Sequence, residues 1–458
     1  MFDTIAAIAT PPGEGGIGII RVSGPEALEV AQRVFRAARA RDWVKEPGYR
    51  MVYGHVVDAA TGEIIDEVLL SIMRAPHSYT REDVVEINAH GGWMAVSRVL
   101  EAVLKAGARL AEPGEFTRRA FLNGRIDLTQ AEAVLDIIRS KTRESMDVAV
   151  SQLRGLLGAR VRELREELVA LQAEIEASID FPEEVGAPAP DGLRARLERV
   201  KDEITRLVAT SETGRVYREG LAVVIVGKPN VGKSSLLNAL LGEERALVTD
   251  IPGTTRDVIE EVARIGGIPV RLADTAGVRE TGDVVEKMGI ERARRKVAEA
   301  DVVLLVLDAA QGVDAGDRVA AELIGGKRRI VVVNKIDLVP EGIPEDVIRE
   351  LAGEVPVVRA SAKKGTNLDA VARTIGELVG RLPRGEDAPV VTNVRHRAAL
   401  ERAGQHISDA LDGVQKSLPL DIVAIDLYGA LGALGEIIGV TATEEIIDRI
   451  FETFCVGK

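Results

Sequence analysis

Four stretches of the chain carry apolar residues three or four positions apart, the spacing of one face of an amphipathic α-helix. The longest runs from Leu157 to Ile179 and stops at Phe181-Pro182, because proline does not continue a helix. A connection rich in proline and glycine, 186–192, separates it from the next pattern. The spacing predicts helices over residues 157–180, 193–212, 394–411 and 420–438.

Between the second and third of these stretches, apolar residues form short unbroken runs instead. Leu221–Val226 is the clearest, 330–333 is a second, and 268–273 and 355–358 are short stretches that are mainly apolar. Unbroken runs are typical of strands buried on both faces of a parallel sheet. The sequence therefore predicts an α/β domain inserted into an α-helical domain. Two independent helical bundles on either side are the alternative, since periodicity does not distinguish the two arrangements.

Residues 1–118 differ from both, because short strand patterns alternate with two helical ones around a Gly/Pro turn at 10–16, which indicates an α+β module. The predicted strands are 5–9, 18–22, 51–57, 67–72 and 83–87, and the predicted helices 26–36 and 94–106. We expect an N-terminal domain over 1–118, a helical domain over 119–217 and 381–458, and the inserted domain over 218–380.

Residues 227–234, GKPNVGKS, lie between the run Leu221–Val226 and a helical pattern. This order is typical of a phosphate-binding loop, in which glycines permit close approach and backbone N–H groups surround the phosphates at a helix N-terminus. Lys233 adds positive charge, and the Ser234 hydroxyl is suited to ligate Mg²⁺. The motif predicts binding of a nucleoside triphosphate.

The residues Asn334, Lys335, Ile336 and Asp337 follow the run 330–333 at the carboxyl edge of the expected sheet. The Asp337 carboxylate accepts two hydrogen bonds, and guanine offers two donors that adenine does not match. Adenine would leave this carboxylate unpaired, so the motif selects GTP over ATP. Ser361, Ala362 and Lys363 form a further loop of the kind that contacts guanine.

Two further motifs complete the set. The first is DTAG, residues 274–277, which supplies the Asp274 carboxylate near the expected Mg²⁺ and the Gly277 N–H for the γ-phosphate. The second contains Thr255, the threonine expected to ligate Mg²⁺ only while GTP is bound. The candidate GTP contacts are Asn230, Val231, Gly232, Lys233, Ser234, Ser235, Thr249, Asp250, Ile251, Pro252, Gly253, Thr254, Thr255, Asp274, Thr275, Ala276, Gly277, Asn334, Lys335, Ile336, Asp337, Ser361, Ala362 and Lys363.

Many GTPases carry a water-orienting glutamine directly after this DxxG motif, but Val278 stands there and neither donates nor accepts a hydrogen bond. Hydrolysis therefore needs another arrangement. The downstream candidates are Arg279, Glu280 and Glu286, and within the phosphate loop Asn230 is suited to hold a monovalent cation near the phosphates. Arg256 is a further candidate catalytic residue; Cys455 is a candidate for a reaction other than GTP hydrolysis.

The composition of the 458 residues is that of an ordinary globular protein, with 46% hydrophobic and 29% charged residues. No apolar run reaches the roughly 20 residues that span a bilayer, and the start of the chain lacks an export signal, so we expect a cytoplasmic protein. One cysteine rules out a disulfide framework. A net charge of −13 disfavours broad electrostatic binding of nucleic acid, although a local basic patch would still permit it.

The ordered GTPase motifs, the start DTIAAIATPPG, the block PGEFTRRAFLNGRID at 113–127 and the final CVGK together resemble the MnmE (TrmE) family of tRNA modification GTPases, over the whole chain. The resemblance implies an N-terminal folate-binding and dimerisation domain, an α-helical domain and a Ras-like α/β P-loop G domain inserted into it. It also implies an activity: addition of an aminomethyl-type, carboxymethylaminomethyl group at carbon 5 of the tRNA wobble uridine.

The one-carbon unit would come from a tetrahydrofolate derivative, in the 5-formyl or methylene form, bound by Arg21, Glu86, Arg125 and Lys458. The implied partners are a second copy of the chain, tRNA and the FAD-dependent protein MnmG (GidA), in a heterotetramer, with neither membrane nor DNA. FAD enters only through that partner. Cys455 is either a simple small hydrophobe or a participant in the modification.

The resemblance further implies potassium-stimulated hydrolysis when two G domains meet. The K⁺ ligands would be Asn230, the carbonyls of Thr249 and Ile251, and the region of Thr254. Ser234 and Thr255 would hold Mg²⁺, and Glu286 would position the attacking water through a second water.

Two other functional classes are weighed against this one. A ribosome-assembly switch would carry a dedicated basic RNA-binding module, which this chain does not show. A folate-dependent transferase that merely contains a G domain would hydrolyse GTP equally well with or without potassium.

Overall fold

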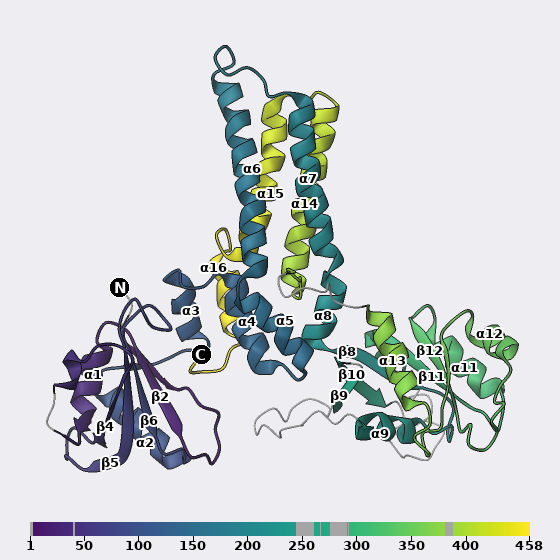
Figure 1. Cartoon of the computed structure of the whole chain (residues 1–458), viewed down its shortest axis with the longest axis horizontal. Coiled ribbons are helices and arrows are strands. Elements are labelled where there is room, and N and C mark those ends of the chain that lie inside the picture. Colours follow the sequence, from purple (N-terminus) through teal and green to yellow (C-terminus); the bar gives the residue numbers. More distant parts are fainter. Residues whose placement is uncertain are drawn as a thin grey trace. The chain divides into compact units, whose positions relative to one another are not determined.

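The computed structural model describes residues 3–39, 42–243, 261–265, 267–274, 291, 293–380 and 388–458 (Figure 1). Residue contacts divide the chain into two compact units. The first contains Met1–Leu135, Val161–Arg165 and Leu431–Lys458, and the second contains Asp136–Arg160 and Glu166–Ala430. In the described residues, no helix is both long and apolar enough to cross a membrane.

The first unit is built on a seven-stranded sheet in the order β3-β4-β5-β6-β2-β1-β7. Its strands are β1 Ile5–Ile8, β2 Gly18–Ser23, β3 Phe35–Ala37, β4 Arg50–Val57, β5 Ile64–Met73, β6 Val84–Ala89 and β7 Arg109–Leu110. Helices α1 Ala27–Val34 and α2 Trp93–Lys105 cover one face. All five predicted strands and both predicted helices are confirmed within a few residues; β3 and β7 were not predicted.

Strand alternation gives this sheet two different faces. Ile20 and Val22 of β2 lie in the core beneath the two helices, and Arg21 between them points to the opposite face. There, Ala7 and Phe116 belong to a separate small core. This second face is where the candidate folate residues lie.

Three short helices complete the first unit. They are α3 Glu115–Leu122, α4 Leu128–Arg139, of which the last residues belong to the second unit, and α16 Glu444–Phe451. A small core that includes Leu128, Leu135, Phe451 and Phe454 joins them. This core fixes the end of the chain, so that the tail, which we define as residues 455–458, is held against the first unit.

The second unit contains the helices on both sides of the inserted domain. These are α5 Arg143–Leu153, α6 Leu156–Asp180, α7 Pro190–Ala209, α8 Ser211–Glu219, α14 Val394–Gln415 and α15 Leu420–Ile438, except that residues 161–165 of α6 and 431–438 of α15 are assigned to the first unit. α14 packs along α7. The two helices are close enough that a Cβ built on Gly404 of α14 would lie 3.4 Å from Cγ2 of Ile204 of α7. The helices that precede and follow the insertion therefore form one bundle, and the alternative of two independent bundles is wrong.

The inserted domain has a six-stranded sheet in the order β13-β12-β11-β8-β10-β9. Its strands are β8 Leu221–Val226, β9 Glu261–Ile265, β10 Ile268–Asp274, β11 Val302–Asp308, β12 Arg329–Asn334 and β13 Val357–Arg359. All neighbouring pairs are parallel except β9 with β10. The flanking helices are α9 Lys233–Glu243, α11 Ala315–Ile324, α12 Glu345–Ala352 and α13 Leu368–Val379.

Two apolar cores, one on each face of this sheet, account for the unbroken apolar runs. Val223 and Ile225 of β8 belong to the core shared with α9 and α13, while Val224 and Val226 belong to the core shared with α11. A strand whose side chains are buried on both faces has no polar alternation. The predicted fold class, a multidomain chain with an inserted Ras-like α/β domain, is confirmed.

Candidate functional site

The loop Gly227–Ser234 connects the carboxyl end of β8 to the first turn of α9. Val231 is fully buried under the loop and anchors it to the core, while Ser234 and Ser235 are exposed on the first turn of the helix. Gly232 has φ +98°, and a Cβ at this position would lie 2.4 Å from Nδ2 of Asn334, so only glycine fits. Lys233 Nζ donates to the carbonyls of Gly227, at 2.8 Å, and Lys228, at 2.9 Å. The loop thus has the compact shape that a phosphate-binding loop requires.

Asn334, 2% exposed at the end of β12, joins the guanine-type loops to the phosphate loop. Its Nδ2 donates to the carbonyl of Val231 at 2.8 Å, and its Oδ1 accepts from the N–H of Ala362 at 3.0 Å. This buried side chain uses both ends of its amide. Three segments that are far apart in the sequence therefore share one hydrogen-bond network.

Lys335 makes a second connection between the same loops. Its Nζ donates to the carbonyl of Asn230 at 2.7 Å and to Oδ2 of Asp308 at 2.7 Å. Asp308 is 1% exposed at the end of β11, and burial of this carboxylate next to a lysine strengthens the contact. Asn230 itself has φ +64°, a conformation that asparagine tolerates better than most residues.

Asp337 lies exposed at the edge of this network. Its Oδ1 accepts a hydrogen bond from the buried Ser361 hydroxyl at 2.6 Å, which lowers the pKa of Asp337. The group is therefore a carboxylate at neutral pH, with acceptor capacity left for the donors of a base. Ile336 donates its N–H to the carbonyl of Ala360, and Lys363 is exposed in the neighbouring loop.

Part of the predicted nucleotide site lies outside the described residues. These residues are Thr249, Asp250, Ile251, Pro252, Gly253, Thr254, Thr255, Arg256, Thr275, Ala276, Gly277, Arg279, Glu280 and Glu286. Asp274 is described only as the last residue of β10, where its backbone pairs with that of Ile225 next to the phosphate loop.

A second site lies on the open face of the sheet in the first unit. Arg21 of β2 and Glu86 of β6 are cross-strand partners, and their side chains form an ion pair at 2.8 Å. The guanidinium also donates to the carbonyl of Gly457 in the tail at 3.4 Å. Its Cζ lies 5.3 Å from the ring centre of Tyr79 and 5.6 Å from that of Phe116, so the cation is held between two aromatic faces.

Arg125 reaches the same aromatic ring from another direction. Its Cζ lies 4.7 Å from the ring centre of Tyr79, and its Nη1 donates to the Tyr79 carbonyl at 3.1 Å. Tyr79 is held in turn by a 2.8 Å hydrogen bond between its hydroxyl and that of Thr117. Arg21 and Arg125 thus share one tyrosine.

The tail brings Lys458 to this cluster. The carbonyl of Lys458 accepts from the N–H of Phe116 at 3.2 Å, and a Cβ at Gly457 would lie 2.2 Å from the carbonyl of Ile8. Burial, followed by repulsion from Arg21, lowers the pKa of Lys458. The structure therefore brings all four candidate folate residues together in one place. Cys455 is an exposed free thiol at the start of the tail.

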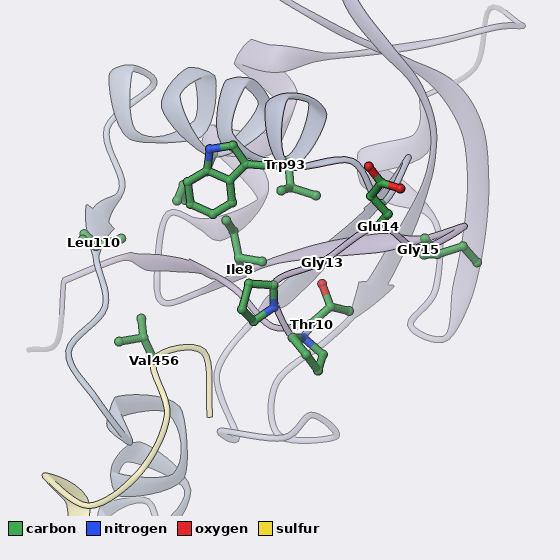
Figure 2. Close-up of a pocket in the computed structure, with 14 residues that line it drawn as sticks. Ile8, Thr10, Gly13, Glu14, Gly15, Trp93, Leu110 and Val456 are labelled. Atoms are coloured by element: carbon green, nitrogen blue, oxygen red, sulfur yellow. The ribbon is translucent and has the colours of Figure 1, made fainter. Parts of the chain in front are cut away.

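An apolar cavity of about 560 Å³ adjoins this part of the first unit. Figure 2 shows Trp93 and Ile8 facing it, with Val456 of the tail at its lower edge. Glu14 is the charged residue of the lining. The volume is within the range of small-molecule sites. The tail connects the two features, because Gly457 contacts Arg21 while Val456 lines the cavity.

Comparison with known proteins decides the family. A family model described as the MnmE helical domain matches residues 128–455, and one described as the N-terminus of the GTP-binding protein TrmE matches residues 4–125. The chain belongs to the MnmE family of tRNA modification GTPases.

Two full-length relatives show the extent of the match. The tRNA modification GTPase MnmE of Moorella thermoacetica is 53% identical over 100% of this chain and 99% of its own length. The MnmE of Desulforamulus reducens is 51% identical over the same shares. Among solved structures, Era of Aquifex aeolicus matches 40% of this chain and 66% of its own at 33% identity, with a TM-score of only 0.29.

Membership of the MnmE family establishes that the protein binds and hydrolyses GTP and acts in tRNA modification. The sequence-based resemblance is therefore confirmed. What the sequence did not identify are the residues that hold the candidate site residues in place. Asp308 and Tyr79 carry no motif, and only their positions in the folded chain reveal their contacts; Phe116 stands within the block 113–127 but was not assigned a role.

Proposed function

We propose that this GTPase adds a carboxymethylaminomethyl group, or a related aminomethyl-type group, at carbon 5 of the tRNA wobble uridine, together with the FAD-dependent protein MnmG. A tetrahydrofolate derivative bound in the first unit would supply the one-carbon unit. The observation that carries this proposal is the convergence of Arg21, Glu86, Arg125 and Lys458, with Glu86 and Lys458 beside Arg21 and with Arg21 and Arg125 both packed on Tyr79.

The chemistry of the cluster suits a folate. The Glu86 carboxylate is an acceptor for the donors of a pterin, and the cations of Arg21, Arg125 and Lys458 suit the carboxylates of the glutamate tail. Tyr79 and Phe116 offer aromatic faces, and the adjoining cavity offers an apolar lining for a ring. When bound, the folate supplies the carbon that is transferred, while these residues bind and orient it. Cys455, exposed beside them, is our candidate for a role in the transfer.

For GTP, we propose that Lys233 and the loop N–H groups bind the β- and γ-phosphates and that Asp337 binds guanine. Ser234 and Thr255 would hold Mg²⁺. Asn230, with the carbonyls of Thr249 and Ile251 and the region of Thr254, would hold K⁺. Glu286 would position the attacking water through a second water, and Arg256 is a further catalytic candidate.

We propose the domain boundaries 1–118, 119–217, 218–380 and 381–458, with dimerisation through the first of these segments. The open face of the N-terminal sheet supports a partner, because Met51, Tyr53 and Leu69 are 58%, 48% and 42% exposed there. Such a dimer, with MnmG, would form a cytoplasmic heterotetramer that acts on tRNA.

Binding of 5-formyltetrahydrofolate by the full chain, measured by calorimetry, tests this proposal. We expect Arg21→Ala to weaken binding by about 10- to 100-fold, because the change removes a charge-assisted contact and leaves Glu86 without its partner. GTP turnover is expected to stay unchanged.

The matched control is Arg98→Ala, which breaks an exposed pair with Glu63 at 3.8 Å in the same unit and is expected to leave folate binding intact. Equal folate affinity of the wild type and Arg21→Ala would remove Arg21 from the proposed folate site, and absence of folate binding by the wild type would contradict the proposal.

A further inference from the structure

The second residue of the phosphate loop, Lys228, has a side chain that points away from the loop towards helix α11. Its Nζ donates to Oδ2 of Asp314 at 2.8 Å and to Oδ2 of Asp317 at 2.9 Å. The Lys228 side chain is only 8% exposed and that of Asp317 is 0% exposed. The long side chain of Lys228 is therefore held in one position by a contact with the buried carboxylate of Asp317.

Both acids belong to a stiff part of the domain, the N-terminal cap of α11. Asp314 accepts from the N–H of Gly316 at 2.8 Å and of Asp317 at 3.3 Å, and Asp317 accepts from the N–H of Asp314 at 3.1 Å. This reciprocal capping box fixes the orientation of both carboxylates. Lys228 is thus tied to a helix end whose geometry is already determined.

The backbone of Lys228 takes part in the loop itself. Its carbonyl accepts from Lys233 Nζ at 2.9 Å, and two residues further on the carbonyl of Asn230 accepts from Lys335. Lys335 in turn binds Asp308, at the start of the same connection that ends at Asp317. The segment 308–317 therefore holds the phosphate loop at two points, through Lys228 and through Lys335.

A contribution to the free energy of folding does not by itself explain why Lys228 is paired with Asp314 and Asp317. Burial opposes the charge of Lys228, although the hydrogen bonds to Asp314 and Asp317 outweigh it and raise the pKa of Lys228. In the described part of the chain, Oδ1 of Asp317 has no hydrogen-bond partner, which adds a further cost. Buried ion pairs are often no more stabilising than apolar residues of the same volume. What such a pair supplies is a fixed geometry.

We propose that Lys228, through its pairing with Asp314 and Asp317, positions the phosphate loop for the triphosphate and is a positioning residue for GTP hydrolysis. The inference rests on the proposed role of the loop in phosphate binding. It predicts that loss of the pair misplaces Asn230 and Lys233 without removing either of them. A displacement of about 1 Å in such groups costs up to about 100-fold in rate.

The test uses the full chain with Lys228→Met, Asp317→Asn and the double variant. Thermal unfolding and steady-state GTP turnover are measured in Mg²⁺ and K⁺. Lys228→Met leaves a buried carboxylate unpaired, so we expect the melting temperature to fall by roughly 5–10 °C together with turnover. The double variant removes both charges, so we expect its melting temperature to return towards that of the wild type.

The decisive result is the activity of the double variant. Positioning predicts that kcat/KM stays about 10- to 100-fold low although stability has returned. A double variant with both stability and kcat/KM of the wild type would show that the pair is only structural and would overturn the inference. So would wild-type turnover by Lys228→Met.

Two further variants separate the possible failures. Arg318→Met changes a residue of the same helix α11 and breaks its exposed pair with Glu350 of α12; it is the matched control and should change neither quantity. Lys233→Ala tests the loop itself. Normal GTP binding by Lys233→Ala would contradict the proposed function, whereas loss of binding there with a normal double variant would overturn only the role of Lys228.

Discussion

The two candidate ligand sites of this chain are built in opposite ways. In the described part of the inserted domain, the phosphate loop and the two guanine-type loops are short contiguous segments at the carboxyl ends of β8, β12 and β13, and the parallel sheet brings them to one edge. In the first unit, the site joins Arg21 to Gly457, which are 436 positions apart. Each motif of the nucleotide site is local in the sequence, whereas the site in the first unit is assembled from single residues that meet only in the folded chain.

The difference affects how each site recognises its ligand. The phosphate loop uses backbone groups whose positions follow from the strand–loop–helix path, so the sequence order alone predicts them. The Arg21 cluster uses long side chains held by Tyr79, Phe116 and a tail that closes over them. A change in one part of the cluster should therefore disturb its other members, whereas a change at one nucleotide motif should affect mainly the group that this motif binds.

The largest expected effect concerns Asp337. We expect Asp337→Asn to weaken GTP binding by about 10²- to 10⁴-fold, because two charge-assisted hydrogen bonds to guanine are lost and a donor faces a donor. Xanthosine triphosphate carries a carbonyl in place of the guanine amine, so its affinity should rise in the same variant. Direct calorimetric titration of the variant and the wild type with each nucleotide measures both affinities.

The exposed Glu341→Gln, in the loop that follows, serves as the control for loss of one negative charge. If Asp337→Asn binds GTP and xanthosine triphosphate as the wild type does, recognition of the base is not local to this motif, and the comparison between the two sites fails.

How far the sequence predicts the structure follows the same division. The bounds of β8 and α15 agree with the apolar patterns at both ends, because a continuous buried face determines each of them. By contrast, α3, α4 and α5 were not predicted, because each of these helices ends after only 8 to 12 residues. Short helices carry too few repeats to establish a period.

The candidate sites show why some residues stay hidden from sequence reasoning. β11 is as apolar as β8, yet no nucleotide motif follows it, and Asp308 gains a role only because Lys335 lies beside it. Arg21 and Glu86 are partners because β2 pairs with β6, a long-range register that no local pattern contains. Arg21 and Glu86 were predicted as site residues only through the family resemblance. No pattern in the sequence between them predicts that their side chains are in contact.

A smaller effect is expected at Asn230, where the salt present should matter. GTP turnover by the wild type should be faster in K⁺ than in Na⁺, and Asn230→Ala should lose that advantage, with a fall of about tenfold in K⁺, because one ligand of the charge-neutralising cation is gone. Turnover in the two chloride salts at equal ionic strength measures this.

Asn230 has φ +64°, so alanine at this position adds backbone strain to the loss of the amide. Asn230→Gly permits the same backbone conformation and also lacks the amide, which isolates the effect of the ligand. Equal wild-type rates in both salts would exclude the cation mechanism, and a normal K⁺ response of Asn230→Gly would exclude Asn230 as a ligand.

The smallest expected effect is the pH dependence of folate binding that Lys458 causes. It tests whether the tail contributes to the site in the first unit. Burial and the nearby Arg21 lower the pKa of Lys458 below its ordinary value of 10.5 in the ligand-free protein. A folate carboxylate favours the charged lysine, so the contribution of Lys458 to binding is complete below the ligand-free pKa. It is lost as the pH rises through the pKa of the complex. Between about pH 7 and about pH 10 we expect affinity for 5-formyltetrahydrofolate to fall by about threefold.

Lys458→Met is the matched variant, because it keeps most of the side-chain volume and does not titrate. Its affinity should be lower at neutral pH and nearly constant over the same range. A further variant, Arg21→Met, removes the neighbouring charge that opposes the protonation of Lys458, so any remaining pH dependence should move to higher pH. Identical pH profiles of the wild type and Lys458→Met would show that the tail does not contribute its lysine to the site. In that case, the site of the first unit would depend on Arg21, Glu86 and Arg125, without the residue farthest along the chain.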